Sequence, residues 1–332
     1  MKIVDLSGFM FSGKSAASDI LREFGGVYVP NYLDEFDLLR MPGGLIDLKN
    51  SVMDWSPIRT YGAVCRFSNL VESLAIYPRF PTNLFKSGYG YAQRYPDIID
   101  LKDQFIKSIM ACHWDTPWPY ADLDDGPIDT FIRKSLRKFT VNRLRKYFLV
   151  DKFKFEESAQ KFVQDLLVEG VDTKMIKLLV THNALEPFSP GKNLNLLGQN
   201  AICIVVDRDP RDIYATAVSK SAGFNVNVKL NRMIAGAHNV ETFIRRYLTY
   251  RQNIDMNDPR VLRLRFEDIV LNYEQTLQKI YEFTGTNASQ HLEKKKYFNP
   301  EKSSKNIGLW ESKSLAGYGE DFKRISRECG FD

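Results

Sequence analysis

The stretch from residue 1 to residue 20 constrains the fold of this 332-residue chain most strongly. It joins an apolar run at residues 3–6 to the sequence GFMFSGKS, which begins at Gly8, ends at Ser15 and fits G-x-x-x-x-G-K-[ST] at every fixed position. Apolar residues then recur at helical spacing up to Phe24. In a strand–loop–helix unit of this kind, glycines let backbone N–H groups point at one anion, and the helix N-terminus adds about half a positive charge. The stretch therefore predicts a phosphate-binding loop, with Lys14 supplying a mobile ammonium group.

The composition indicates a folded protein with an anionic ligand. Hydrophobic residues make up 44% and aromatic residues 13% of the chain, which is enough for a sizeable core. The net charge of +5 is too mild for a protein that coats nucleic acid. Four cysteines lie far apart without a C-x-x-C pair, which indicates a reducing compartment. Because the chain has neither a signal-peptide pattern nor an apolar run approaching about 18 residues, we expect a cytoplasmic protein without a membrane span.

Strand-type and helix-type segments alternate at both ends of the chain but not in its middle. Apolar runs of strand type recur at residues 175–180, 201–206 and 261–266, and the second is continuous, as in a parallel strand buried on both faces. Residues 41–174 are rich in aromatic and basic residues and have irregularly placed turns. We therefore expect a single α/β domain over residues 1–332, with a three-layer P-loop-type parallel sheet flanked by helices. Residues 41–174 are predicted to form a mostly helical insertion that covers the nucleotide site and helps to form the acceptor site.

Two groups of residues in the insertion leave alternatives open. A dense basic run over residues 133–146 is most simply a solvated helix face, and contact with an acidic acceptor such as a polyanionic glycan is the alternative. His113, Trp114 and Trp118 suit stacking against a sugar, although packing in the core is the simpler interpretation. If the protein transfers a group from the nucleotide, the insertion favours a carbohydrate as the acceptor of that group, or otherwise a small anionic or aromatic metabolite.

Polar side chains follow the carboxyl ends of the predicted strands. These residues are His182, Arg208 and Glu267. Ligands of open α/β sheets bind at this edge, so we expect these residues and the phosphate-binding loop to converge on one crevice. Glu267 is expected to anchor the loops and not to catalyse. An acidic cluster of Asp34, Glu35 and Asp37 could line the same site, although a polar helix face explains it equally well.

The order of these segments resembles the sulfotransferases that use 3′-phosphoadenosine 5′-phosphosulfate (PAPS). The segments that carry the resemblance are residues 8–15, 177–187, 205–212, 265–285 and 302–310. The most specific is VVDRDPRD at residues 205–212, which is similar to the family pattern V-x-R-[ND]-P-[KR]-D. The resemblance covers roughly residues 1–30 and 175–312, and it leaves out the insertion.

This resemblance implies transfer of a sulfuryl group from PAPS, the nucleotide donor, to a hydroxyl or amine of an acceptor, with no metal ion expected. His182 is the expected general base, because histidine titrates near neutral pH. Lys14 is expected to stabilise charge at the reacting oxygens. Arg208 offers a planar fork for the 3′-phosphate, and Thr216 stands where the family has a serine that shares that phosphate. The residues assigned to the donor are Gly8, Ser12, Gly13, Lys14, Ser15, Arg208, Thr216, Lys302 and Lys305.

Four positions depart from the family pattern. Phe11 stands where the family has a lysine or arginine in the donor loop, and Lys14 stands where it has a threonine. Val180 replaces a lysine that would neutralise the bridging oxygen, and Ser303 stands where many members have arginine. Lys14 is placed as in a nucleoside-triphosphatase loop, and we expect it to supply the charge of the missing lysines.

Two other functions stay open at this point. The loop alone favours a P-loop kinase that uses Mg-ATP, with Ser15 as a metal ligand. Such a kinase usually also needs an acidic strand end, and only the cluster at residues 34–37 offers candidates. The other alternative is a nucleotide-binding relative that has lost catalysis together with the usual lysines.

Overall fold

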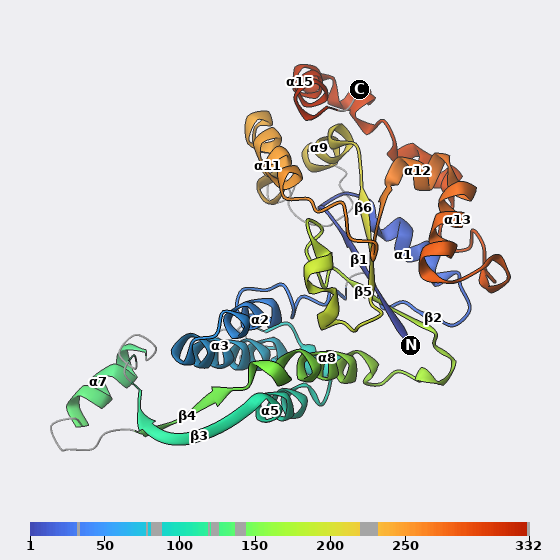
Figure 1. Ribbon diagram of the computed structural model, residues 1–332. Helices are drawn as coiled ribbons and strands as arrows, with labels where there is room; N and C mark the ends of the chain where they lie inside the picture. Colours follow the sequence, from blue (N-terminus) through green and yellow to red (C-terminus); the bar gives the residue numbers. More distant parts are fainter. Residues whose placement is uncertain are drawn as a thin grey trace. The chain divides into compact units, whose positions relative to one another are not determined.

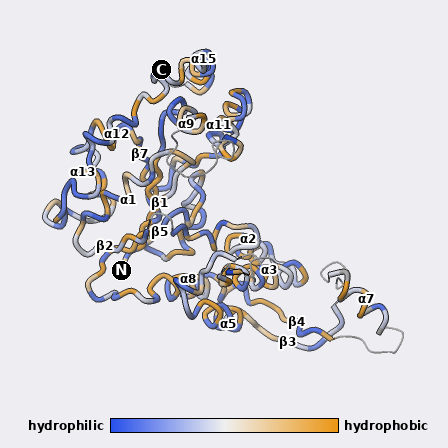
Figure 2. Tube along the Cα trace, turned by 180° about the vertical axis from the view of Figure 1, so that it is seen from behind, coloured by the Kyte–Doolittle hydropathy of each residue, from blue (hydrophilic) through white to orange (hydrophobic). Residues whose placement is uncertain are grey.

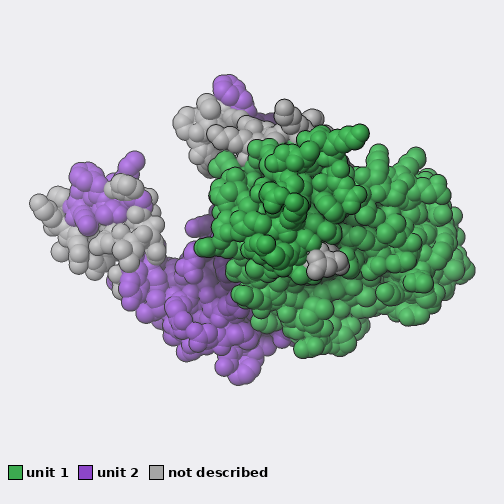
Figure 3. Space-filling view, turned by 90° about the horizontal axis from the view of Figure 1, so that it is seen from above, with its two compact units in different colours: residues 1–40, 172–332 green, residues 41–171 purple. Residues whose placement is uncertain are grey.

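The computed structural model describes residues 1–31, 34–77, 79–80, 88–118, 120, 126–136, 144–219 and 232–330. The chain divides into two compact units (Figure 3). Unit 1 consists of Met1–Arg40 and Asp172–Asp332, and unit 2 is Met41–Val171. The boundary after Arg40 coincides with the change in composition at residue 41.

Unit 1 is built on a five-stranded sheet in the order β2-β5-β1-β6-β7 (Figure 1). Every neighbouring pair of strands is parallel. The strands are β1 Lys2–Gly8, β2 Val27–Tyr28, β5 Leu178–His182, β6 Ile202–Asp207 and β7 Val261–Arg265. The expected parallel α/β sheet is therefore confirmed.

The centre of this sheet is buried because its strands are almost wholly apolar. All five residues of β5, the first five of β6 and residues 3–7 of β1 are buried. This is the pattern of parallel strands that are covered on both faces. Figure 2 shows hydrophobic residues along these strands at the centre of unit 1.

Helices flank the sheet in two groups, which Figure 1 shows on opposite sides of it. One apolar cluster joins the strands to α1 Lys14–Arg22, α12 Phe266–Leu271 and α13 Tyr273–Thr284. A second cluster joins α9 Pro210–Val218, α11 Val240–Gln252 and α15 Gly319–Cys329. A short helix, α14 Pro300–Ser303, lies in the C-terminal segment between α13 and α15. The 3-10 turns of unit 1 are η3 Thr173–Met175, η4 Pro190–Leu196, η5 Ala288–Gln290, η6 Ser304–Asn306, η7 Leu309–Glu311 and η8 Lys313–Tyr318.

Unit 2 is mostly helical. Its helices are α2 Leu45–Met53, α3 Pro57–Ala75, α4 Tyr91–Arg94, α5 Ile98–Ile109, α7 Pro127–Leu136 and α8 Lys152–Val168. Their core is aromatic: Phe67, Phe105 and Phe162 lie with ring centroids 5.2–5.9 Å apart. None of the helices that the structure describes is both long enough and apolar enough to cross a membrane.

Unit 2 also contains an antiparallel pair of strands that the sequence did not predict. β3 Met110–Pro117 pairs with β4 Leu144–Val150. The basic run at residues 133–146 is therefore not one helix, because Arg133 and Lys134 lie in α7 whereas Arg145 and Lys146 lie in β4. Its other predicted members, Arg137, Lys138 and Arg143, lie outside the described residues.

Candidate functional site

The loop between β1 and α1 is shaped by its two glycines. Gly13 has a φ of 84°, and a Cβ at this position would lie 2.5 Å from the ring of Phe266. Only glycine meets both conditions without strain. A Cβ at Gly8 would lie 2.5 Å from Oγ of Ser12 and 3.0 Å from the carbonyl oxygen of Val206. The loop therefore curls as tightly as the motif predicts.

The same loop offers donors for an anion. Its hydroxyl at Ser12 is buried and has no hydrogen-bond partner among the residues that the structure describes. The first amides of α1, which begins at Lys14, have no acceptor within the helix and lie at its positive end. Buried polar groups are nearly always hydrogen-bonded, so an unpaired hydroxyl here fits a ligand oxygen. These features suit a phosphate or sulfate group.

Lys14 is engaged by an acidic residue on the segment that follows β2. Its Nζ lies 3.2 Å from Oε1 of Glu35, and the lysine side chain is only 17% exposed. Burial lowers the pKa of Lys14, and the Glu35 carboxylate opposes this shift. Arg40 lies 2.9 Å from the other oxygen of Glu35, and the side-chain amide of Asn183 also donates to the carboxylate. The Glu35 carboxylate therefore occupies the position beside Lys14 where the anionic group of a ligand would bind.

His182 lies at the carboxyl end of β5, opposite Leu6 of β1. Its ring is fully buried, and neither ring nitrogen makes a hydrogen bond of normal geometry to a described residue. Burial and the nearby charge of Lys14 lower the pKa of His182 to about 4, although the carbonyl of Pro30 opposes the shift. The imidazole is therefore neutral at pH 7, and it accepts a proton less readily than an exposed histidine.

A buried carboxylate supports this end of the sheet. Asp5 of β1 is fully buried and accepts hydrogen bonds from the hydroxyl of Thr181 at 2.8 Å and from the backbone N–H groups of Ala184 and Leu185 at 3.0 and 3.2 Å. Burial raises the pKa of Asp5, and these hydrogen bonds oppose part of the shift. The contacts fix the turn in which Asn183 adopts a φ of 50°, and from this turn Asn183 reaches Glu35.

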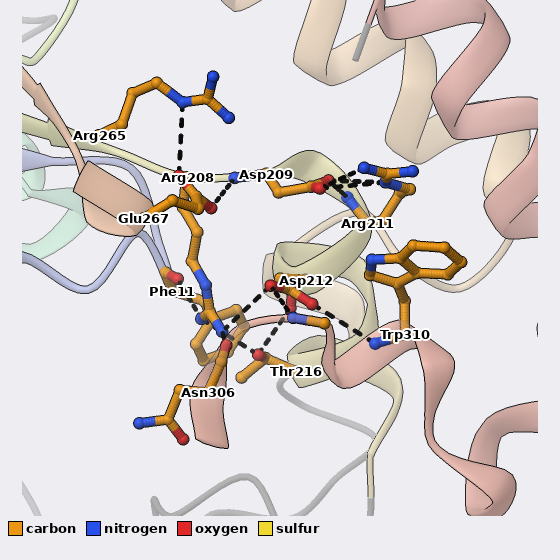
Figure 4. A network of polar contacts seen from close by, with 11 residues as sticks. Phe11, Arg208, Asp209, Arg211, Asp212, Thr216, Arg265, Glu267, Asn306 and Trp310 are labelled. Carbon is orange, nitrogen blue, oxygen red and sulfur yellow. Dashed lines mark hydrogen bonds and ion pairs between the residues drawn. The ribbon is translucent and has the colours of Figure 1, made fainter. Parts of the chain in front are cut away.

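Arg208 follows β6, which lies on the other side of β1 from β5. Figure 4 shows its contacts. Its Nη1 donates to the carbonyl of Phe11 at 3.0 Å and lies 3.5 Å from Oγ1 of Thr216. Its Nη2 donates to the carbonyl of Asn306. The residue is 5% exposed, and its guanidinium lies 5.1 Å from the centre of the Phe266 ring. Arg208 thus connects the loop, α9 and the C-terminal segment.

Phe11 has a φ of 62°, which is unusual for a residue other than glycine. This left-handed conformation belongs to the loop whose Phe11 carbonyl accepts the hydrogen bond from Arg208. The backbone of Phe11, and not its side chain, therefore takes part in the site. The phenylalanine side chain cannot supply the positive charge that the family has at this position.

Asp212 of α9 secures the C-terminal segment beside Arg208 (Figure 4). It accepts hydrogen bonds from the backbone N–H groups of Gly308 at 3.0 Å and Trp310 at 3.4 Å. Glu267 accepts from the backbone N–H of Asp209 at 2.9 Å, which is the anchoring role expected from the sequence. These carboxylates hold backbone segments around the arginine.

The predicted donor residues are only partly assembled. The loop, Arg208 and Thr216 lie together, whereas the side chains of Lys302 and Lys305 are exposed and make no hydrogen bond or ion pair to another described residue. Lys305 nevertheless directly precedes Asn306, whose carbonyl binds Arg208. Ser15 is exposed at the start of α1. The roles given to these residues remain predictions.

The sequence did not predict the contact between Lys14 and Glu35 or the contacts of Glu35 with Arg40 and Asn183. Glu35 was recognised only as a member of an acidic cluster, and Arg40 and Asn183 were not singled out. The cluster's position after the phosphate-binding loop was the available signal. No sequence pattern indicated that Asp5 is buried, because a single acidic residue in a strand also fits an exposed position.

Comparison with known proteins bears on the part of the site around Arg208. Residues 191–290, less than half of the chain, match the model of the sulfotransferase family. No curated protein matches the sequence.

Solved structures with some likeness include the sulfotransferase domain of the Synechococcus PCC 7002 olefin synthase. It is 14% identical with a TM-score of 0.38, and the match covers 100% of this chain and 94% of that one. The sulfotransferase domain from the curacin biosynthetic pathway is 12% identical with a TM-score of 0.36 and coverages of 100% and 98%. Sulfotransferase STF9 from Mycobacterium avium is 12% identical with a TM-score of 0.37 and coverages of 100% and 76%. These scores are too low to carry an argument about function.

The matched segment contains β6, Arg208, Thr216, β7 and Glu267, and it excludes the phosphate-binding loop and His182. It includes VVDRDPRD, which was the most specific part of the resemblance. The resemblance of this chain to the sulfotransferase family is thereby confirmed over residues 191–290.

Proposed function

We propose that this protein transfers a sulfuryl group from PAPS to a hydroxyl or amine of an acceptor, with a carbohydrate as the expected acceptor. The observation that carries the proposal is the placement of one anion-binding loop between two sets of cations. Lys14 and Arg40 lie toward β5, and Arg208 lies on the β6 side within the segment that matches the sulfotransferase family. The match supports sulfuryl transfer in general, and the donor and acceptor are our inference.

The residues of the loop fit the 5′-phosphosulfate of such a donor. The curl at Gly8 and Gly13, the unpaired hydroxyl of Ser12 and the first amides of α1 would hold its oxygens. Lys14 would neutralise charge on the oxygen that leaves with the phosphate. The sulfur–oxygen bond to that phosphate breaks, a bond forms from sulfur to the oxygen or nitrogen of the acceptor, and the acceptor loses one proton.

Arg208 can bind a 3′-phosphate through an unpaired donor and through an exchange of partners. Its Nη groups already donate to the carbonyls of Phe11 and Asn306, and its buried Nε has no partner within the described part of the chain. A phosphate can therefore accept from Nε and replace one of the carbonyls at an Nη group. Because hydrogen bonds from a guanidinium to an anion are stronger than those to neutral carbonyls, this exchange is favourable.

The acceptor's proton requires a base that the acceptor can reach. His182 is fully buried, so an acceptor cannot reach its ring in the described conformation. The side chain of Glu35 is 36% exposed and lies 3.2 Å from Lys14, the residue proposed to stabilise the leaving oxygen. We therefore propose Glu35 as the proton acceptor and keep His182 as the alternative to be tested.

Calorimetric titration with 3′-phosphoadenosine 5′-phosphate (PAP) and with Mg-ATP tests the donor. We expect PAP to bind more tightly, and Lys14→Met to weaken PAP about tenfold or more by removing a charge-assisted contact. Lys279→Met, which removes an exposed lysine of α13, is the matched control and should leave PAP binding unchanged.

Three outcomes would overturn the proposal. Preference for Mg-ATP with indifference to the 3′-phosphate would favour the P-loop kinase. Binding of neither nucleotide would remove the basis for any donor site in this loop. Tight PAP binding without transfer from PAPS to any of a panel of saccharides, phenols and amines would favour a nucleotide-binding protein without catalytic activity.

A further inference from the structure

Unit 2 contains a cavity that none of the features above explains. It has a volume of about 530 Å³ and lies between α3, the end of β3 and β4. Its lining residues come from α3 at positions 58–69, from Trp118 and Tyr120 after β3, and from Arg145 of β4. This volume is within the range of about 300–1,000 Å³ that small-molecule sites usually have. The cavity is a candidate binding site that lies wholly within unit 2.

One wall of the cavity is aromatic. The ring centroids of Tyr61 and Trp118 lie 4.7 Å apart, and those of Trp118 and Tyr120 lie 5.5 Å apart. Tyr147 lies behind them, stacked on Trp118 at 5.7 Å. Tyr61 and Trp118 are almost buried, so packing holds them rigidly, whereas Tyr120 is 43% exposed. The prediction that Trp118 packs in a core and the prediction that it serves a sugar are therefore compatible.

The rim of the cavity is positively charged. Arg59, Arg66 and Arg145 line it, and none of the ten described residues that line it is acidic. The side chain of Arg66 is exposed and makes no hydrogen bond or ion pair to a described residue. Arg59 pairs with Asp54 at 2.9 Å, but both side chains are more than 60% exposed, so this pair is weak and easily exchanged. An anion is the ligand that this set of charges favours.

The rings and the polar rim together bear on the class of anionic ligand. The planes of Tyr61 and Trp118 are inclined by 52°, and those of Trp118 and Tyr120 by 68°. Such a wall can contact the C–H face of a puckered ring, and it can also contact a flat aromatic ring face-on or edge-on. Asn69 and the arginines favour the sugar, because they can bind several hydroxyls as well as an acidic group at the rim.

We propose that this cavity binds an acidic sugar unit, that is, a pyranose ring that carries a carboxylate or a sulfate group. The ring lies against Tyr61, Trp118 and Tyr120, and its acidic group binds Arg66 together with Arg59 or Arg145. This inference does not require the donor chemistry at Lys14, because every residue it uses belongs to unit 2. If the protein is a sulfotransferase, an acidic saccharide bound in unit 2 is the first acceptor to test.

Isothermal titration of the full chain, without nucleotide, tests the proposal. The probe is the disaccharide of glucuronic acid and N-acetylgalactosamine, and lactose, 4-hydroxybenzoate and inorganic sulfate are the comparison ligands. We expect measurable binding of the acidic disaccharide and at least tenfold weaker binding of the other three. Arg66→Gln and Tyr120→Leu change exposed side chains, so the variants should fold, and each should weaken the disaccharide about fivefold or more.

Lys161→Gln is the matched control, because it removes one exposed positive charge from α8 of the same unit and should leave binding unchanged. Equal binding of lactose, tighter binding of 4-hydroxybenzoate, or binding of sulfate alone would each overturn the assignment to an acidic sugar. So would disaccharide binding that Arg66→Gln leaves intact. Lys14→Met should not affect this titration, so failure of the donor site and failure of the sugar site are distinguishable.

Discussion

Replacement of Glu35 by glutamine is expected to move donor binding and turnover in opposite directions. Lys14 lies 3.2 Å from one oxygen of Glu35, and Arg40 lies 2.9 Å from the other. A phosphosulfate has to compete with this carboxylate for both cations, whereas a glutamine amide carries no charge. The substitution therefore removes a competitor at Lys14, and it also removes the group that we propose as the proton acceptor.

The size of the binding effect follows from the geometry of the pair. Two unit charges 3.2 Å apart attract each other by about 5 kcal/mol at an effective dielectric constant of about 20. Because the Glu35 side chain is 36% exposed, solvent screening reduces the net attraction to about 1 kcal/mol. PAP should therefore bind about fivefold more tightly to Glu35→Gln. Loss of a general base should lower the transfer rate by about 10²–10⁴-fold.

Calorimetry with PAP gives the binding change, and transfer of labelled sulfate from PAPS gives the rate. Glu274→Gln is the matched control, since Glu274 is an exposed carboxylate of α13 whose described ion pair is with Lys294 and not with Lys14 or Arg40. The fivefold gain should shrink at about 1 M salt, where the Debye length is about 3 Å. Weaker PAP binding in Glu35→Gln would refute the competition. A rate within tenfold of the wild type would refute the role of Glu35 as proton acceptor and return attention to His182.

Three further results are expected for stability, each measured by urea denaturation. Gly13→Ala places a Cβ in left-handed backbone and 2.5 Å from the ring of Phe266, so the free energy of unfolding should fall by about 2–4 kcal/mol; an unchanged midpoint would contradict the described loop. Glu23→Gln should lower the free energy of unfolding by about 2–4 kcal/mol. The buried Glu23 carboxylate accepts hydrogen bonds from the ring of His291 and from the backbone N–H groups of Lys295, Tyr297 and Phe298. A glutamine amide has only one acceptor oxygen, so it cannot accept all of them. Little change there would mean that these donors find water instead. The pKa of His182 is about 4 in the folded chain and about 6.5 when unfolded, so the unfolded chain binds more protons between these values. Stability should therefore fall by up to about 3 kcal/mol as the pH is lowered from about 6.5 to 4. His182→Gln should flatten this part of the profile, and an unaltered profile would show that another group titrates.

The sheet was largely predictable because its strands are apolar and the loop motif fixes the first of them. The strand expected at residues 175–180 is observed at Leu178–His182 instead. Met175 belongs to a 3-10 turn and is 80% exposed. The strand was predicted to begin too early because Met175 and Ile176 are apolar, whereas the hydrogen-bonded pairing begins at Leu178, opposite Lys2. Hydropathy located the strand, and the hydrogen-bonded register sets its ends.

The β3–β4 pair could not be read from hydropathy in the same way. Six of the eight residues of β3 are exposed, so the strand lacks the alternation that marks a half-buried strand. Its pairing with β4 joins residues 27 to 40 positions apart, and a local pattern cannot report such a contact. The cavity beside these strands was invisible for the same reason, although Trp118 had been recognised as a possible sugar-stacking residue.

The site illustrates how a motif defines a ligand without defining the network around it. GFMFSGKS predicts the loop, and VVDRDPRD predicts an arginine at the end of the next strand. Neither indicates that Arg208 is already bound to the carbonyls of Phe11 and Asn306. A phosphate that takes Arg208 from these carbonyls frees parts of the loop and of the C-terminal segment, while Asp212 still holds the segment at Gly308. Lys302 and Lys305 lie just before this anchor, so the exposed lysines can approach a phosphate that their present positions do not contact. On this argument the donor does not enter a finished site, and its 3′-phosphate helps to assemble one.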